Sequence, residues 1–75
     1  MTRQEFLTTL QEMLQCDMEL HEDTLLTDLE EWDSLAFMVV IAFFDKNFGR
    51  RITFDTLKGC RTPSDLIALS AGAIA

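Results

Sequence analysis

The chain has 75 residues, of which 48% are hydrophobic and 25% charged, and a formal net charge of −7. A chain of this size buries only about 60% of its unfolded surface on folding, which argues against a two-domain enzyme and favours a single small, non-enzymatic domain over residues 1–75. Six basic residues against thirteen acidic ones leave no basic patch, so nucleic acid and anionic membranes are excluded as partners.

The charge is unevenly distributed along the chain. Residues 1–45 hold one basic and eleven acidic side chains, a net −10, whereas residues 46–75 hold five basic and two acidic ones, a net +3. Eight of the acids lie between Asp17 and Asp33, a stretch without Lys or Arg. We therefore expect a partner with a basic surface for the acidic part.

The two cysteines, Cys16 and Cys60, are too few for a disulfide framework. The residues after Met1 do not form the apolar stretch of a signal peptide. The longest apolar run, Leu35–Phe44, has only ten residues and is too short to span a bilayer. We expect a cytoplasmic protein with reduced thiols.

The first predicted helix covers residues 3–15, because Thr2-x-x-Glu5 is typical of a capping box and apolar residues follow at helical spacing. Residues 16–33 lack periodicity and predict a long acidic loop, and loops of this length in a small domain are usually functional. Within this loop, the apolar residues expected to tuck against the helices are Leu20, Leu25, Leu26, Leu29 and Trp32.

Asp33 is a good N-cap for a second helix that begins at Ser34 and stops at Gly49. This helix is apolar on nearly all sides, so in a small bundle part of it must remain exposed. The arc expected to face the core holds Phe37, Val40, Ile41, Phe44 and Phe48. The opposite, exposed arc holds Leu35, Val39, Ala42, Phe43 and Lys46, with Met38 at its edge.

Two shorter helices follow. Thr53 is a possible N-cap for a short third helix through Phe54 and Leu57. A last helix opens at Thr62-Pro63-Ser64-Asp65, where threonine caps, proline occupies the first turn and the acid complements the helix dipole. Residues 71–75 are expected to fray. The pattern predicts an all-α fold, a small four-helix bundle with three main helices, a short third helix and a long acidic first loop.

Ser34 is the most informative candidate for chemistry. A phosphodiester on its hydroxyl would meet free backbone N–H groups and the positive end of the helix dipole, and the nearby acids would attract a basic enzyme. The alternative is that Ser34 only helps to cap the helix.

The segment Leu26–Leu35, with Asp33-Ser34-Leu35 at the start of the second helix, resembles the prosthetic-group site of acyl carrier proteins. The Trp32-Asp33-Ser34-Leu35 form resembles that of free-standing carriers used outside bulk fatty-acid synthesis. The resemblance covers nearly the whole chain, including its length, the acidic first loop, the Phe48-x-x-x-Ile52 junction and the short third helix. It implies the four-helix carrier-protein fold.

The resemblance also implies a mechanism. Ser34 would carry a 4′-phosphopantetheine arm, attached by a phosphopantetheinyl transferase from coenzyme A, and the arm's thiol, not Cys16 or Cys60, would hold the cargo as a thioester. The other implied partners are an acyl- or aminoacyl-loading ligase or synthase and downstream acyl-transferring enzymes, and the carrier itself is expected to be a monomer. The predicted partner surface consists of Asp33, Leu35, Met38, Val39 and Phe43.

Two regions depart from the family pattern. Acids usually line the exposed arc of the recognition helix, where this chain has Ala36, Val39 and Lys46, with Phe43 also exposed. The third-helix region is commonly acidic, whereas here the charged residues are mainly Arg50, Arg51, Lys58 and Arg61. We hypothesise a dedicated partner with an apolar contact surface. For Arg50 and Arg51 the default expectation is that they balance the acidic loop through exposed ion pairs, and contact with a partner is the alternative.

Alternatives remain for the function. An aminoacyl carrier more often has Gly-Gly where this chain has Glu31-Trp32, so an acyl cargo is favoured. An unmodified module that binds a partner through Leu35–Phe43 is a third possibility. A metal site around Cys16 and His21 is disfavoured because paired ligands are missing, and a Ser–His hydrolase because no nucleophile elbow is present.

Overall fold

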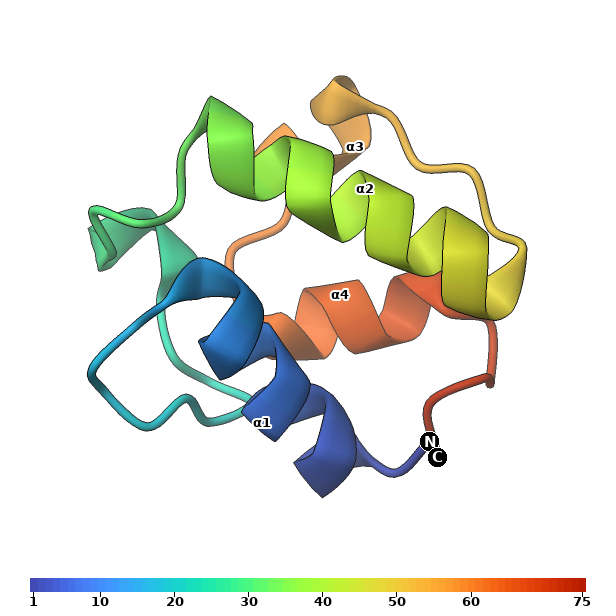
Figure 1. Ribbon diagram of the computed structural model, residues 1–75, viewed down its shortest axis with the longest axis horizontal. Helices are drawn as coiled ribbons and strands as arrows, with labels where there is room; N and C mark the ends of the chain where they lie inside the picture. The colour runs from blue at the N-terminus through green and yellow to red at the C-terminus, as the bar shows by residue number, and fades with distance from the viewer.

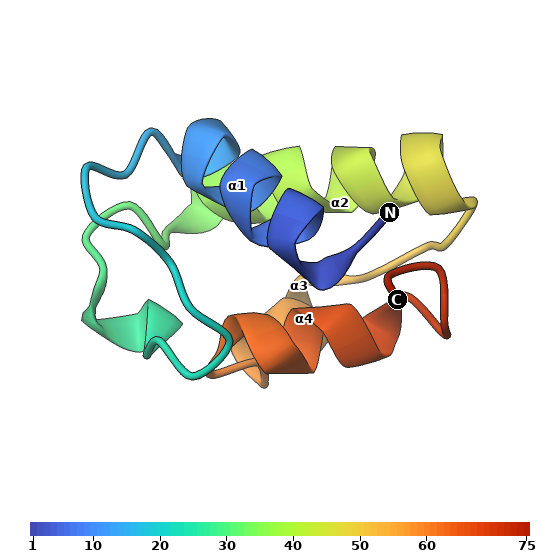
Figure 2. The same cartoon turned by 90° about the horizontal axis from the view of Figure 1, so that it is seen from below.

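The computed structural model describes all 75 residues and is entirely helical. Its elements are α1 (Arg3–Leu14), the 3-10 turn η1 (Leu26–Asp28), α2 (Ser34–Phe48), α3 (Phe54–Lys58) and α4 (Pro63–Leu69). Seen from below, α1 and α2 form one layer and α3 and α4 the other (Figure 2). The predicted bundle with three main helices and a short third one is confirmed.

The predicted helix starts at Thr2, Asp33 and Thr53 use the caps expected from the sequence. The Thr2 hydroxyl accepts from the Glu5 N–H at 3.1 Å, and the Glu5 carboxylate accepts from the Thr2 N–H at 2.8 Å. Asp33 Oδ1 accepts from the Ala36 N–H at 3.0 Å, which places the first turn of α2 at Ser34. The α1 helix ends at Leu14, one residue earlier than predicted.

The two short helices begin in the same way. The Thr53 hydroxyl accepts from the Thr56 N–H at the start of α3. At the start of α4, the Asp65 carboxylate accepts from the N–H groups of Arg61 and Thr62. At α4 the bonds to free N–H groups therefore come from Asp65 and not from the Thr62 hydroxyl, which was expected to cap this helix.

One apolar cluster holds the four helices together. It includes fully buried side chains from each of them, among them Phe6 on α1, Phe44 on α2, Leu57 on α3 and Leu66 on α4. The rings of Phe6 and Phe44 meet edge to face, with centroids 6.1 Å apart. Burial of several large side chains at one centre is the main source of the fold's stability.

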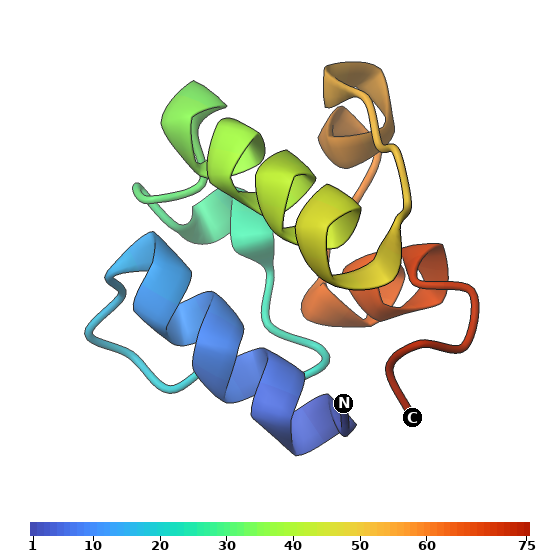
Figure 3. The same cartoon turned by 45° about the vertical axis from the view of Figure 1, so that its right-hand side comes forward.

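Two residues expected on the exposed arc of α2 are covered instead. Ala36 is only 6% exposed. Phe43 is half-buried, with its ring 6.2 Å from that of Phe6 and 5.5 Å from that of Phe48. The predicted exposure of both was wrong, because α1 lies along this side of α2 and covers it, as Figure 3 shows. A helical wheel cannot say on which side the neighbouring helix lies.

The acidic loop is anchored to the last helix. Leu20 and Leu26 are buried, as predicted, whereas Leu25 is exposed because it caps η1 and points outward. The Leu26 N–H donates to the Arg61 carbonyl at 2.8 Å. The single ion pair of the structure joins Arg3 to Glu22. The loop is therefore held in place at one end of the bundle, which is the left end in Figure 1.

The C-terminal tail is docked, so the predicted fraying was wrong. Ile74 is 4% exposed, and its N–H donates to the buried Ser70 hydroxyl at 3.2 Å. The Ala75 N–H donates to the Met1 carbonyl at 2.8 Å, and the Arg3 N–H donates to the Ala75 carbonyl at 3.0 Å. The two ends of the chain therefore lie together (Figure 1). A buried isoleucine among alanines and glycine is what holds the tail down.

Arg50 and Arg51 do not balance the acidic loop, contrary to the prediction. Neither forms an ion pair, and both are exposed. They follow the C-terminal end of α2, whereas the acidic loop leads into its N-terminal end (Figure 1). A helix of 15 residues separates its two ends by about 22 Å, well beyond the Debye length in physiological salt.

Candidate functional site

The start of α2 leaves the Ser34 hydroxyl free. Ser34 is the first residue of the helix and is exposed, and its hydroxyl makes no hydrogen bond. The capping bond that serine often provides is made by Asp33, whose carboxylate accepts from the Ala36 N–H. The N–H groups of Ser34 and Leu35 have no partner within the protein. The hydroxyl is therefore open to modification beside two unused donors.

An aromatic row fixes the turn that carries Ser34. Trp32 is half-buried, and its ring meets that of Phe37 edge to face at 4.8 Å. Phe37 in turn contacts the ring of Phe54 on α3 at 5.7 Å. Because three rings from the loop, α2 and α3 pack in sequence, the residue pair Asp33-Ser34 has a defined position against the bundle.

Several carboxylates lie close to Ser34 along the chain. Glu30, Glu31 and Asp33 directly precede Ser34, and Asp28 lies in η1. No Lys or Arg lies between residues 4 and 45, so no basic neighbour in the sequence offsets these carboxylates. A basic protein surface would be attracted to the immediate approach to Ser34.

An exposed apolar ridge runs along α2 from Ser34. Leu35 is 69% exposed, Met38 57% and Val39 37%, and Ala42 is also exposed. We call these four residues the α2 crest. The predicted exposure of Leu35, Met38 and Val39 is confirmed, whereas Phe43 does not belong to the crest. Large apolar side chains that stay exposed in a row usually mark a contact surface.

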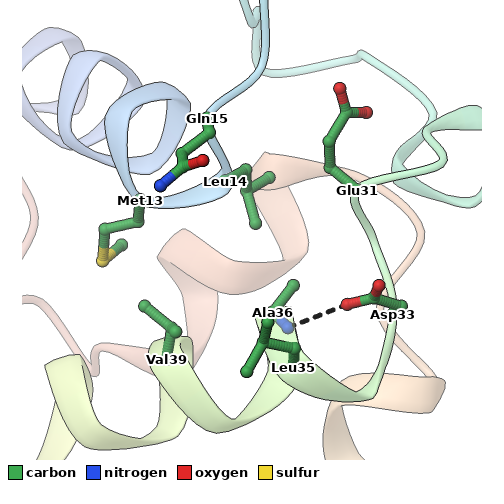
Figure 4. A pocket seen from close by; sticks show the side chains of 8 residues that line it. All are labelled: Met13, Leu14, Gln15, Glu31, Asp33, Leu35, Ala36 and Val39. Atoms are coloured by element: carbon green, nitrogen blue, oxygen red, sulfur yellow. Dashed lines mark hydrogen bonds between the residues drawn. The ribbon is translucent and has the colours of Figure 1, made fainter.

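A hollow of about 320 Å³ lies between α1 and α2, directly beside Ser34. The end of α1 forms one wall and Leu35, Ala36 and Val39 of α2 form the other, while Glu31 and Asp33 lie where the acidic loop leads into α2 (Figure 4). Its lining consists of Met13, Leu14, Gln15, Glu31, Asp33, Leu35, Ala36 and Val39. Sequence reasoning missed the contribution of α1, because Met13 reads as ordinary core filling. Gln15, which ends α1 and also lines the hollow, has a left-handed backbone with φ of 54°. The residue type glutamine does not indicate this conformation.

A second, larger groove of about 500 Å³ lies on the other side of the crest, between α2 and α3. We call it the α2–α3 groove. Its lining consists of Met38, Ile41, Ala42, Asp45, Arg51, Ile52, Thr53 and Phe54. Phe54, the first residue of α3, is 39% exposed. One signal in the sequence could have indicated the exposure of Phe54. Ile52 and Phe54 alternate with polar residues, and the helix that begins at Phe54 is too short to bury both side chains.

The chain's own thiols are poor candidates for chemistry. Cys16 and Cys60 are both free and buried. Burial raises the pKa of the Cys60 thiol, and the negative charge of Asp65 raises it further. The Cys60 S–H also donates to the Thr56 carbonyl at 3.4 Å. A thiol held protonated in this way is a weak nucleophile. No three side chains of the His, Cys, Asp and Glu types gather into a metal-binding group.

Comparison with known proteins identifies the family. The family described as "Phosphopantetheine attachment site" matches residues 4–70. Searches of curated proteins and of solved structures give no match. None of the helices is long and apolar enough to cross a membrane. Members of the matched family are carrier proteins that hold 4′-phosphopantetheine covalently on a serine, and they interact with phosphopantetheinyl transferases and acyl-handling enzymes. Since the match covers almost the whole all-helical chain, this protein belongs to the phosphopantetheine attachment site family and is a phosphopantetheine-carrying carrier protein.

Proposed function

We propose that this chain carries acyl groups as thioesters on a 4′-phosphopantetheine arm attached to Ser34, without catalysing a reaction itself. The observation that carries the proposal is the free, exposed Ser34 hydroxyl at the first residue of α2, with the capping bond made by Asp33 instead. The unused N–H groups of Ser34 and Leu35 and the positive end of the helix dipole suit a phosphodiester at this position.

The other serines fit less well. Ser70 is buried, and its hydroxyl donates to the Ile67 carbonyl at 2.7 Å. Ser64 is exposed near the start of α4, but its N–H donates to the Glu22 carbonyl, so the acidic loop covers that helix start. Ser34 alone combines a free hydroxyl and a free N–H with the exposed crest beside it.

The surroundings of Ser34 suggest how a transferase recognises it. Asp33 and Leu35 flank the serine and also line the hollow between α1 and α2. A transferase with basic side chains and one apolar side chain could contact the carboxylates of Glu31 and Asp33 while filling this hollow. Charge would then speed the encounter, and the apolar contact would hold the hydroxyl in place for transfer.

The arm supplies a flexible tether that ends in a thiol, and the chain's own residues present it. A tethered cargo has a high effective concentration at any enzyme that binds the carrier. The α2 crest is apolar where related carriers are usually acidic, which supports a dedicated loading ligase or synthase and dedicated downstream acyl-transferring enzymes. If general fatty-acid synthase components elongated the loaded carrier as fast as their own, the dedicated partner would be contradicted.

Intact-mass spectrometry tests the attachment site. The chain is incubated with coenzyme A and a broad-specificity phosphopantetheinyl transferase, and we expect a mass increase of one phosphopantetheinyl group. Ser34→Ala should abolish the increase. Ser64→Ala is the matched control, since it removes another exposed hydroxyl near a helix start, and it should be modified as fast as the wild type. Modification of Ser34→Ala would contradict the assignment.

The acyl or aminoacyl character of the cargo needs a separate measurement. The residues before Asp33 are Glu31 and Trp32 rather than a glycine pair, which supports acyl. Carrier isolated from its natural source is treated with hydroxylamine to release the thioester, and the product is analysed by mass spectrometry. A hydroxamate without an amino group is expected; an aminoacyl hydroxamate would show the aminoacyl alternative.

A second candidate function rests on the crest itself. An exposed row of Leu35, Met38 and Val39 would also suit a helical module that binds a partner without any modification. The mass experiment separates the two candidates, because an unmodified module gains no mass with any of several transferases.

A further inference from the structure

The two sides of the α2 crest differ in charge. The hollow toward α1 is edged by two carboxylates, those of Glu31 and Asp33, and by no cation. The α2–α3 groove holds one carboxylate and one guanidinium, from Asp45 and Arg51. Residues 45–55, which supply five of the lining residues, hold Lys46, Arg50 and Arg51 against Asp45 and Asp55, a net charge of +1. A single partner surface cannot complement both sides equally well.

The guanidinium of Arg51 is not used within the protein. The one ion pair of the structure joins Arg3 and Glu22, so Asp45 and Arg51 line the same groove without contacting each other as an ion pair. No hydrogen bond from the Arg51 side chain to any protein group is present, and the residue is exposed. Five planar donors at the edge of an apolar groove are suited to a carboxylate brought by another molecule.

The remaining lining gives the groove its second property. Ile41 and Ile52 contribute apolar surface between the helices, and Met38 and Phe54, both exposed, stand at its edges. The groove therefore offers apolar contact along its length and a cation at one end. Apolar side chains next to a carboxylate are what an amphipathic helix of a partner protein presents.

We infer that the α2–α3 groove docks an acidic amphipathic segment of a partner protein, with Arg51 binding its carboxylate. The inference rests on the proposed carrier function and adds to it that the carrier has two faces. The acidic hollow beside Ser34 serves the basic transferase, and the α2–α3 groove serves an enzyme that handles the cargo. A hydrocarbon cargo would leave the Arg51 guanidinium without a partner, whereas a carboxylate supplies one.

Peptide titrations followed by NMR test the charge preference. The uniformly ¹⁵N-labelled chain is titrated at physiological ionic strength with a synthetic helical peptide that has leucines on one face and glutamates on the other. The matched probe replaces each glutamate with lysine. The acidic peptide should shift the amide signals of Ile41, Ile52 and Phe54, whereas the lysine peptide should shift those of Glu31 and Leu35. Absence of the first set of shifts overturns the inference.

Substitution of Arg51 gives the second arm of the experiment. Arg51→Gln should weaken the acidic peptide roughly tenfold, as expected for loss of a hydrogen bond between charged groups. Arg61→Gln is the matched control, because it makes the same change of net charge outside the groove, and it should bind as the wild type does. Equal binding by Arg51→Gln and the wild type overturns the inference.

The proposed function and the groove can fail separately. If no variant is modified by transferase and coenzyme A, the carrier proposal fails. If Arg51→Gln is modified normally but the acidic peptide shows no preference for the wild type, only the groove assignment fails. Loading the arm with an octanoyl group provides a further check. Octanoyl-dependent shifts at Ile41 and Ile52 that block the acidic peptide would make the groove a cargo site and overturn the inference.

Discussion

Both long sides of α2 hold large apolar residues, but one side is buried and the other is exposed. Phe37, Val40 and Phe44 on the core arc are between 0% and 8% exposed. On the other side of the same helix, Leu35 and Met38 are 69% and 57% exposed. The core arc meets α1, α3 and α4 through the central cluster, whereas the crest is largely exposed to solvent at the edges of the hollow and the groove. The first arc therefore stabilises the fold, and the second contributes little to it.

The difference shows where an apolar residue has a function beyond folding. Burial of a large apolar side chain is worth about 1.5–3 kcal/mol, and an exposed one gains almost none of this. A small domain that keeps three large apolar side chains exposed in one row must gain something else, since such patches favour aggregation. A contact with partner enzymes is the gain that fits a carrier protein.

The largest expected effect comes from breaking the core arc. Phe44→Ala should lower the free energy of unfolding by about 3–5 kcal/mol, because it removes a fully buried ring and leaves a cavity. Leu35→Ala is the matched change on the crest, and it should alter the free energy of unfolding by no more than about 0.5 kcal/mol. Urea denaturation followed by circular dichroism measures both values.

In the modification assay Leu35→Ala should have the larger effect and Phe44→Ala the smaller one, the reverse of their effects on stability. Leu35→Ala should slow phosphopantetheinylation roughly tenfold, since burying a leucine at a contact is worth about 1.5–3 kcal/mol. The folded fraction of Phe44→Ala should be modified at close to the wild-type rate. Equal loss of stability in the two variants would contradict the comparison, and so would an unchanged modification rate in Leu35→Ala.

A smaller loss of stability is expected at the C-terminal tail. Ile74→Ala should cost about 2 kcal/mol, at the lower end for a buried isoleucine because the short tail can relax around it. Ala73→Gly is a suitable control, because Ala73 is exposed and adjacent. Hydrogen exchange at the Arg3 and Ala75 amides, which close the contact between the chain ends, should accelerate in Ile74→Ala only. If exchange there is already fast in the wild type, the docking of the tail is contradicted.

Local signals predicted most of the fold and the position of Ser34. The caps at Thr2, Asp33 and Thr53 are short-range hydrogen bonds between residues three apart, so the residue types alone indicate them. The start of α2 at Ser34 followed directly from Asp33. The apolar arcs of α2 could also be predicted from the local sequence, because helical periodicity determines which residues share a side of the helix.

Long-range packing explains what could not be predicted. The exposure of Phe43 depends on where α1 lies relative to α2, and a wheel of one helix does not contain this information. The two grooves arise from pairs of helices, so Met13 and Arg51 become neighbours of the crest only through the tertiary fold. Docking of Ile74 depends likewise on the central cluster, which elements distant in sequence form. Sequence reasoning predicted where Ser34 lies in the fold, but not the hollow and the groove on either side of the crest.

The helix cap next to Ser34 can separate stability from recognition. Asp33→Ala removes the acceptor of the Ala36 N–H and should cost about 1 kcal/mol. Asp33→Asn keeps an acceptor oxygen and removes the charge, so it should retain most of the stability. If the charge of Asp33 attracts the transferase, both variants should be modified more slowly, and the difference should shrink at high salt. Wild-type modification of Asp33→Asn would assign to Asp33 a capping role only.

The smallest expected effect is a pH dependence at the start of α1, the helix whose Phe6 packs against the core arc and not against the crest. The hydrogen bonds from the Thr2 N–H and hydroxyl lower the pKa of Glu5 below its ordinary value of 4.5. The pKa of Glu5 is lower in the folded state than in the unfolded state, so its ionised form stabilises the fold above pH 4.5. This contribution is lost as the pH falls through the lowered pKa. The twelve other acids also titrate on acidification, so the measurement is the difference between the wild type and Glu5→Gln in urea midpoint. The difference should be largest at neutral pH and should disappear in acid, while the amide signals of Leu35 and Met38 stay the same in both proteins. A constant difference across this range would show that the Glu5 carboxylate does not stabilise the start of α1 through its charge.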